Sequence, residues 1–127
     1  QHLDGDNQNR RDLAAHYTSL LGDDACSPAI RQGAEHVFHL YVVRTTRRQA
    51  LMAHLKSQEI HTGIHYPAPV HLQPAYKGRV RTARSMDVTE RLAQEVLSLP
   101  IYPELGVDSV IRVAQTIKNF VARDDHD

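Results

Sequence analysis

The segment that most restricts the fold of this chain is residues 36–44, with the sequence HVFHLYVVR. It is rich in β-branched and aromatic side chains and has almost no polar interruption, which is typical of a strand covered on both faces. We therefore expect a central strand here. His36 and His39 are an odd number of positions apart and so point to opposite faces of such a strand, where packing is their expected role.

Amphipathic helices are predicted around this strand. Apolar residues recur at helical spacing over residues 10–21, 46–57 and 107–122, and from residue 87 onward through Leu92, Ala93, Val96 and Leu97. Gly22 is expected to end the first helix. Thr46 with Gln49, and Asp87 with Glu90, have the form of capping boxes at the starts of the second and third helices.

Residues 59–76, EIHTGIHYPAPVHLQPAY, combine three histidines, two tyrosines and three prolines. Alternation over residues 60–66 predicts a short strand with one buried face. Proline cannot donate to a sheet, so we expect residues 67–76 to form an ordered irregular loop across the surface. The basic segment 77–86 has no apolar period and is expected to be exposed and mobile. Residues 98–105, SLPIYPEL, predict an extended connection.

Few strands and four helices predict an α+β domain of two layers, in which a small, mainly antiparallel sheet is covered by helices. Fifteen basic and fifteen acidic residues cancel, so no net charge attracts the chain to nucleic acid or to a membrane. No apolar run reaches membrane-spanning length. The single cysteine, Cys26, cannot form an internal disulfide, so we expect a cytoplasmic protein.

Three histidines, His61, His65 and His71, are the candidates for metal binding, because imidazole is a common metal ligand. In the predicted strand, His61 and His65 would stand roughly 13 Å apart at about 3.3 Å per residue, too far to share one ion. No carboxylate or thiol lies close in the sequence to complete a ligand set. We therefore predict no metal.

The candidates for a nucleic-acid footprint are the arginines at positions 44, 47, 48, 79, 81 and 84. Their segments lack interleaved aromatic residues on which bases could stack. A solvated face and a charged loop are the preferred interpretation, without a nucleic-acid partner. Cys26 has no histidine near it in the sequence, and the chain has neither a Gly-x-Ser-x-Gly elbow nor a glycine-rich phosphate loop. No catalytic site is predicted from these residues.

The tripeptide His65-Tyr66-Pro67 places an imidazole beside a phenol at the end of a predicted strand. Such a pair suits binding of an anionic or polyhydroxylated ligand, without itself supplying a reaction. A structural role is the alternative, in which the Tyr66 hydroxyl is satisfied locally at a half-buried strand end.

Several segments, taken in order, resemble the C-terminal domain of the DegT/DnrJ/EryC1/StrS family of sugar aminotransferases. They are RRDLAAHYTSLL, HVFHLYVV, EIHTGIHYPAPVHLQPAY and TERLAQEVLSLPIYPEL. The resemblance covers nearly the whole chain, and HYPAPVHLQPAY and LSLPIYPEL are its most specific parts. It implies the small domain of a fold-type I enzyme dependent on pyridoxal 5'-phosphate (PLP). Such enzymes work as homodimers and move an amino group, typically from glutamate, onto a keto-sugar nucleotide.

The same resemblance implies roles for particular residues. His65 and Tyr66 match the family's His-Tyr-Pro segment, which lies near the nucleotide sugar and its phosphates, so we expect them to bind substrate. His71, Gln73 and Tyr76 match the adjoining loop and are expected near the cleft or the subunit boundary. The chain departs from the family at KGRVRTARSMDVTE, where relatives commonly have a glycine and a proline before the helix.

Residues 1–127 correspond to the small domain alone, so we expect a C-terminal piece of a longer polypeptide whose large, PLP-binding domain is absent here. Lys56, Lys77 and Lys118 do not match the family's cofactor-lysine motif. The chain would then close the substrate cleft, contain no catalytic residue and be inactive alone. The alternatives are a PLP-dependent sugar dehydratase or regulatory relative, and a non-enzymatic interaction domain.

Overall fold

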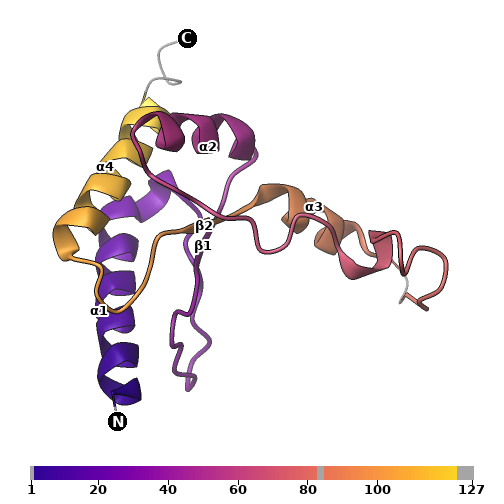
Figure 1. The fold of residues 1–127 in the computed structure, drawn as a ribbon, viewed down its shortest axis with the longest axis horizontal. Helices are drawn as coiled ribbons and strands as arrows, with labels where there is room; N and C mark the ends of the chain where they lie inside the picture. Colours follow the sequence, from indigo (N-terminus) through magenta and orange to yellow (C-terminus); the bar gives the residue numbers. More distant parts are fainter. Residues whose placement is uncertain (1, 83–84, 123–127) are drawn as a thin grey trace.

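The computed structural model describes residues 2–82 and 85–122, so Arg84 and the C-terminal residues 123–127 lie outside the described residues. Within the described part, four α-helices and two strands follow one another along the chain (Figure 1). The helices are α1 (Leu3–Leu21), α2 (Arg48–Ser57), α3 (Asp87–Glu95) and α4 (Val107–Ala122). The strands are β1 (Tyr41–Arg44) and β2 (Val96–Leu99), and the 3-10 turns are η1 (Gly22–Asp24) and η2 (Val70–Leu72).

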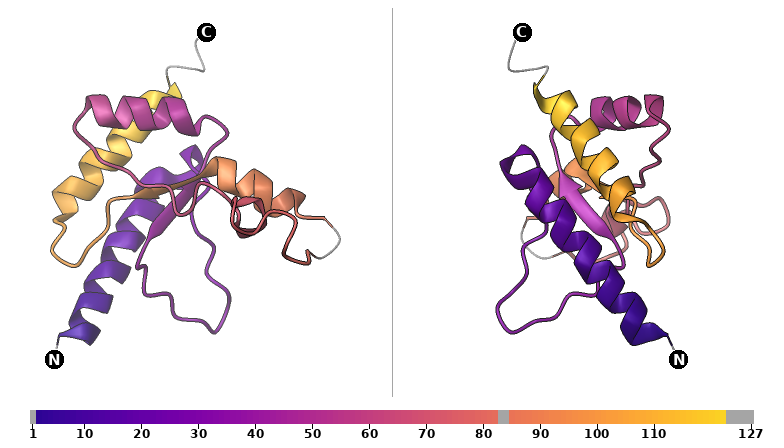
Figure 2. Two further views of the ribbon diagram at one scale, coloured as in Figure 1. Left: turned by 45° about the vertical axis from the view of Figure 1, so that its right-hand side comes forward. Right: turned by 90° about the vertical axis from the view of Figure 1, so that its left-hand side faces the viewer.

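The sheet is small and antiparallel. β1 and β2 pair in a register that places Tyr41 opposite Leu99, and single bridges add Cys26 beside β1 and Gly63 beside β2. Helices α1 and α4 pack against each other on one side of these strands, and α2 packs on α4 (Figure 2). The predicted α+β class, a small antiparallel sheet covered by helices, is confirmed.

The core lies between α1, α4 and the sheet. Its buried apolar side chains are Leu13, Ala14, Tyr17, Leu21, Phe38, Tyr41, Val43, Leu51, Leu55, Ile60, Leu97, Leu99, Ile101, Leu105, Val110, Val113, Ala114 and Ile117. The rings of Tyr17 and Tyr41 stack with their centroids 4.9 Å apart. The Tyr17 hydroxyl donates to the carbonyl of Pro100 (2.9 Å). Burial raises the pKa of Tyr17 because the phenolate would lose its hydration.

The first and last helices follow the predicted periodicity. α4 has the predicted bounds and buries Val110, Val113 and other residues of the expected stripe. α1 ends at Gly22 as predicted, where a φ of 50° favours glycine. It begins at Leu3 rather than at residue 10, so its first turns were missed because they are polar and exposed.

The predicted central strand over residues 36–44 is wrong in its first half. Nδ1 of His36 accepts a hydrogen bond from the backbone N–H of Phe38 (2.8 Å), and Phe38 has a φ of 47°. This local bond competes with strand pairing. The carbonyls of Phe38 and His39 bind the Arg10 guanidinium of α1 (3.4 and 3.3 Å). Both histidines are exposed, and β1 has one partner strand, so it is not central to a larger sheet.

The two predicted capping boxes do not form. The hydroxyl of Thr45, not that of Thr46, accepts the N–H of Arg47 just before α2 (3.1 Å). At the start of α3, the hydroxyl of Ser85 accepts the N–H of Asp87 (3.2 Å). Both hydroxyls lie before the N-cap position of the helix, and the N-cap residue itself makes no side-chain hydrogen bond to the first turn. As the structure describes them, neither helix has a side-chain cap.

Tertiary pairing also overrides two predictions based on periodicity. Val96 and Leu97 were expected on the third helix but belong to β2, because they pair with β1. Residues 60–66 were expected to form a strand, yet only Gly63 pairs, with Ser98. The predicted extended connection over residues 98–105 begins as the end of β2.

Residues 65–82 and 85–95 form an arm that projects from the core (Figure 1). Within its described part, neither η2 nor α3 contains a buried residue. Its large exposed apolar side chains are Tyr66, Val70, Leu72, Tyr76, Val80 and Val88. The irregular loop after Pro67 and the exposure of residues 77–82 agree with the predictions, while mobility stays a prediction. Among the described helices, none is long and apolar enough to cross a bilayer.

Candidate functional site

A cleft opens where the arm leaves the core, between the His65–Gln73 loop and α3. It has a volume of about 320 Å³. The loop contributes His65, Tyr66, Ala68, Pro69, Val70 and Gln73, and the opposite wall contributes Thr89, Leu92, Ala93 and Val96. Mostly apolar walls with a few polar groups are typical of small-molecule sites. The cleft brings together three of the five predicted site residues: His65, Tyr66 and Gln73.

His65 is held at the inner end of this cleft. Its Nδ1 lies 2.9 Å from Oγ of Ser98 on β2, and the Ser98 side chain is buried. Gly63 pairs with Ser98 through two backbone hydrogen bonds of 3.1 and 2.8 Å. The position of the His65 imidazole is therefore set by the sheet rather than by the loop alone.

Tyr66 is an exposed residue of the cleft. Its side chain is 75% exposed, and its ring meets the His65 ring edge-on with centroids 5.8 Å apart. Among the described residues, the Tyr66 hydroxyl has no hydrogen-bond partner. Tyr66 is therefore not half-buried, and within residues 2–82 and 85–122 its hydroxyl is not satisfied locally, as the structural alternative required.

His71 and Tyr76 do not face this cleft. His71 Nε2 lies 2.9 Å from Oε1 of Glu90, and the His71 side chain is only 11% exposed, so it joins η2 to α3. It lines a different pocket, on the other side of Thr89. Tyr76 is exposed further out on the arm. Within the described residues, these two candidates belong to the support and surface of the arm.

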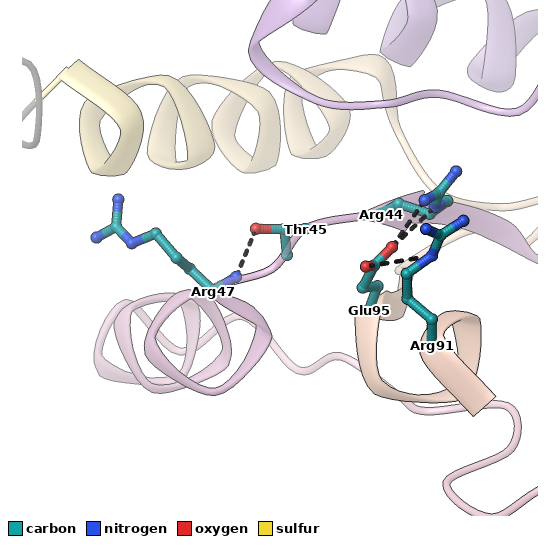
Figure 3. A network of polar contacts seen from close by, with 5 residues as sticks. All are labelled: Arg44, Thr45, Arg47, Arg91 and Glu95. Carbon is teal, nitrogen blue, oxygen red and sulfur yellow. Dashed lines mark hydrogen bonds and ion pairs between the residues drawn. The ribbon is translucent and has the colours of Figure 1, made fainter. Parts of the chain in front are cut away.

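The arginines that were weighed as a nucleic-acid footprint, and interpreted as a solvated face and a charged loop, lie in different surroundings. Arg44 binds Glu95 at the end of α3 (2.7 Å), and Arg91 approaches the same carboxylate (4.0 Å; Figure 3). The hydrogen bond to Glu95 raises the pKa of Arg44. Arg48 donates to the carbonyls of Ala93 and Val96.

Arg47 lies over the Phe120 ring, 4.2 Å from its centroid, and turns away from Arg44 (Figure 3). Arginines 44 and 48 therefore attach the arm to the core, and the three do not form one basic patch. Arg79 and Arg81 are exposed on the arm.

A metal or a Schiff-base lysine is not assembled at this cleft. In residues 2–82 and 85–122, no group of three histidine, cysteine or acidic side chains is placed to hold a metal ion. Lys56 lines a separate pocket with His61, Lys77 is exposed on the arm, and Lys118 lies 3.6 Å from Asp24. None of these lysines lines the His65 cleft, so the described residues of the cleft do not fit the covalent anchoring of PLP.

A larger pocket of about 550 Å³ lies between α1 and the loop before β1. Its walls include Ala14, Ile30 and Phe38. It contains none of the residues that the sequence predicts to bind substrate. We therefore prefer the smaller cleft as the candidate site.

Three residues of the site region were missed by the sequence predictions. Ser98 holds His65, Thr89 lines the cleft, and Glu90 binds His71. Ser98 stands as one polar residue within the apolar segment Val96–Leu99, which is a usable signal for a buried polar contact. Thr89 and Glu90 look like ordinary surface positions of a helix, and only the folded arm places them at the pocket walls.

The chain is similar to known proteins over nearly its whole length. The family model described as the DegT/DnrJ/EryC1/StrS aminotransferase family matches residues 1–118. A dTDP-3-amino-3,4,6-trideoxy-alpha-D-glucose transaminase of Streptomyces venezuelae is 41% identical over 126 residues, covering 98% of this chain and 33% of the relative. A pleiotropic regulatory protein of Geobacillus stearothermophilus is 40% identical, covering 94% of this chain and 33% of the relative.

Solved structures agree with these matches. The crystal structure of S. venezuelae DesV in complex with a ketimine intermediate superposes with a TM-score of 0.90 at 40% identity. The match covers 94% of this chain and 33% of that one. The chain thus spans about a third of the length of the relatives that it matches.

Proposed function

The chain belongs to the DegT/DnrJ/EryC1/StrS aminotransferase family, and from this membership we propose that it is the C-terminal small domain of a nucleotide-sugar aminotransferase. Residues 1–127 form that domain, and a large PLP-binding domain belongs to the same longer polypeptide. The small domain closes one side of the substrate cleft, with His65 and Tyr66 in contact with the substrate.

One observation carries this proposal: the segment that is most specific to the family also lines the cleft. His65, Tyr66 and Gln73 all come from HYPAPVHLQPAY, and their side chains meet the wall formed by α3. A segment needed only to fold the domain would have its polar groups satisfied within the core. Here the Tyr66 side chain is 75% exposed at a cleft, which supports a role in binding.

The chemistry of the cleft suits a nucleotide sugar. Such a ligand carries phosphate oxygens and sugar hydroxyls, which accept and donate hydrogen bonds, and ring faces that pack on apolar groups. The Tyr66 hydroxyl, the His65 imidazole and the Gln73 amide supply the polar contacts. Leu92 and Val96 supply apolar surface on the opposite wall. These groups orient the substrate.

Members of this family depend in general on PLP, which supplies the electron sink for transamination. No lysine within the described residues lines the cleft, so the Schiff-base lysine and most cofactor contacts belong to the large domain. We expect no turnover from the 127-residue chain with added PLP. Measurable transamination by this chain alone would contradict the proposal that the large domain supplies the Schiff-base lysine and this domain supplies only substrate contacts.

The remaining partners follow from the same family. Glutamate is the proposed amino donor, and the full-length protein is a homodimer with no nucleic-acid or membrane partner. We place it in the cytoplasm, because the single cysteine is an exposed free thiol, which suits a reducing compartment.

The test uses the full-length protein that carries this chain, with PLP, glutamate and a panel of keto-sugar nucleotides. Tyr66→Phe and His65→Ala are each expected to raise KM for the sugar nucleotide by about two- to tenfold, because each removes one hydrogen bond to the bound substrate. The value of kcat should change less. Steady-state kinetics of 2-oxoglutarate release measures both constants.

Two matched variants serve as controls: Tyr102→Phe and His16→Ala, which change exposed side chains outside the cleft. Both should leave KM unchanged. A large loss of kcat at unchanged KM in the cleft variants would contradict a binding role for His65 and Tyr66.

A regulatory function is the second candidate, because one relative at 40% identity bears the name pleiotropic regulatory protein. The same kinetic test separates the two. A full-length protein that binds PLP and a sugar nucleotide but forms no amino sugar would favour regulation over catalysis.

A further inference from the structure

On the side away from the cleft, the His65 imidazole is bound to a buried serine. Nδ1 of His65 lies 2.9 Å from Oγ of Ser98, whose side chain is 4% exposed. Ser98 is the one buried polar residue found in the described part of the chain. The backbone of Ser98 is fixed on both sides, by β1 and by Gly63. Its hydroxyl is therefore a rigid point to which the imidazole is bound.

Gly63 leaves the space in which the His65 ring lies. A Cβ atom at position 63 would stand 2.7 Å from Cε1 of His65, closer than real Cβ contacts occur. The φ of Gly63 is not positive, so this glycine is needed for space and not for its backbone conformation. Any side chain at position 63 would push the imidazole away from Ser98.

The hydrogen atoms of this pair can be assigned by requiring that buried donors be satisfied. A buried hydroxyl that does not donate its hydrogen costs free energy. Among the described residues, Nδ1 of His65 is the one hydrogen-bond partner of Ser98 Oγ. If Nδ1 carried a hydrogen, the hydroxyl hydrogen of Ser98 would have no acceptor. Nδ1 therefore accepts, and the neutral ring carries its hydrogen on Nε2.

The other end of the imidazole faces outward. His65 is an exposed residue that lines the cleft, and Nε2 has no hydrogen-bond partner among residues 2–82 and 85–122. An Nε2–H group at this position donates to an oxygen of a ligand. It cannot accept a hydrogen from a donor such as an ammonium group.

We propose that Ser98 is a positioning residue, which holds the His65 imidazole so that the Nε2–H tautomer is the one adopted by the uncharged ring, with a hydrogen-bond donor presented to the cleft. Gly63 provides the space that this arrangement requires. The acceptor would be a phosphate or hydroxyl oxygen of the sugar nucleotide, and this last assignment rests on the proposed function. The role of His65 is thus donation of a hydrogen bond, not removal of a proton.

The tautomer is measured directly by long-range 1H–15N correlation spectra of the 127-residue protein labelled with [15N]histidine, at a pH where the ring is neutral. His65→Ala assigns the signals. We expect Nε2 to bear the hydrogen and Nδ1 to be bare. An Nδ1–H ring, or shifts averaged between the two tautomers, would overturn the proposal whatever the substrate is.

Substitutions test the cause. Ser98→Ala and Gly63→Ala should each bring the His65 nitrogen shifts towards the average of both tautomers, while Ser98→Thr, which keeps the hydroxyl, should retain the wild-type shifts. Ser109→Ala and Gly5→Ala are the controls, since both positions are exposed and a Cβ at Gly5 meets nothing within 4 Å. Unchanged His65 shifts in folded Ser98→Ala would also overturn the proposal.

The binding consequence is measured in the full-length protein. Ser98→Ala is expected to raise KM for the sugar nucleotide by about two- to tenfold with little change in kcat, and Ser98→Thr to restore it. If the full-length protein had no transaminase activity, the proposed function would fail, and the tautomer measurement would still decide the role of Ser98.

Discussion

The core and the arm of this chain are joined through one short sheet, yet they keep their shapes in different ways. In the core, α1 and α4 bury a continuous apolar cluster against β1 and β2. In the arm, η2 and α3 bury no residue fully, and apolar side chains such as Val70 and Val88 face outward. Burial of apolar surface therefore accounts for the shape of the core but not for that of the arm.

The arm depends instead on specific polar contacts at its base. Arg48 binds the carbonyls of Ala93 and Val96, and Arg44 binds Glu95. The Arg44–Glu95 pair adds little to stability, because ion pairs near the surface are weak, whereas hydrogen bonds from the charged Arg48 side chain contribute more. Most of the buried apolar surface that stabilises this domain therefore lies in the core, whereas the candidate binding cleft lies almost entirely on the arm.

The largest expected effect comes from removing core volume. Leu55→Ala empties space around a fully buried side chain and should lower the free energy of unfolding by about 2–5 kcal/mol. Leu72→Ala, at an exposed position of the arm, should change it by no more than about 0.5 kcal/mol. Urea denaturation followed by circular dichroism measures both. Equal losses for the two variants would break the distinction between core and arm.

A smaller effect is expected at the base of the arm. Arg48→Met removes two hydrogen bonds from a charged donor and should cost about 1.5–3 kcal/mol. The amides of residues 93–99 should also exchange hydrogen faster, because their carbonyl anchors are lost. Arg31→Met, at an exposed position of the loop between η1 and β1, is the control. If residues 93–99 kept their protection in Arg48→Met, this anchor would not hold the arm.

The smallest effect concerns one hydroxyl of the core. Tyr17→Phe loses the hydrogen bond to Pro100 and should cost about 1 kcal/mol at neutral pH. The folded pKa of Tyr17 is raised above 10.0 by burial, so its contribution to stability is complete below pH 10 and is lost as pH rises further. The stability difference between wild type and Tyr17→Phe should therefore shrink above pH 10.

Urea unfolding at a series of pH values measures this difference, and Tyr76→Phe is the matched arm variant, with no expected cost at neutral pH. A wild-type advantage that grew above pH 10 would show that Tyr17 ionises more readily in the folded state, opposite to the effect of burial.

Some elements of the core and of the arm could be predicted from the sequence, and others could not. Apolar residues at helical spacing identified α4 with its bounds and the buried face of α1. This was possible because all residues of one helix face belong to one continuous segment of the sequence. Signals that span only a few residues were less reliable, and the predictions of a strand over residues 60–66 and of two capping boxes were wrong. The candidate site was half predicted: His65, Tyr66 and Gln73 meet at the cleft, but Ser98 and Thr89 were missed.

The amino-acid sequence by itself determined the α+β class, the family and the segment that lines the cleft. Each of these follows from patterns of residues that are close together in the chain. The tertiary structure alone decided that β2 begins at Val96, that Ser98 meets His65, and that His71 turns to Glu90. These contacts join residues that are distant in the chain, and hydrogen bonds between such residues depend on how the strands pair, not on any local pattern.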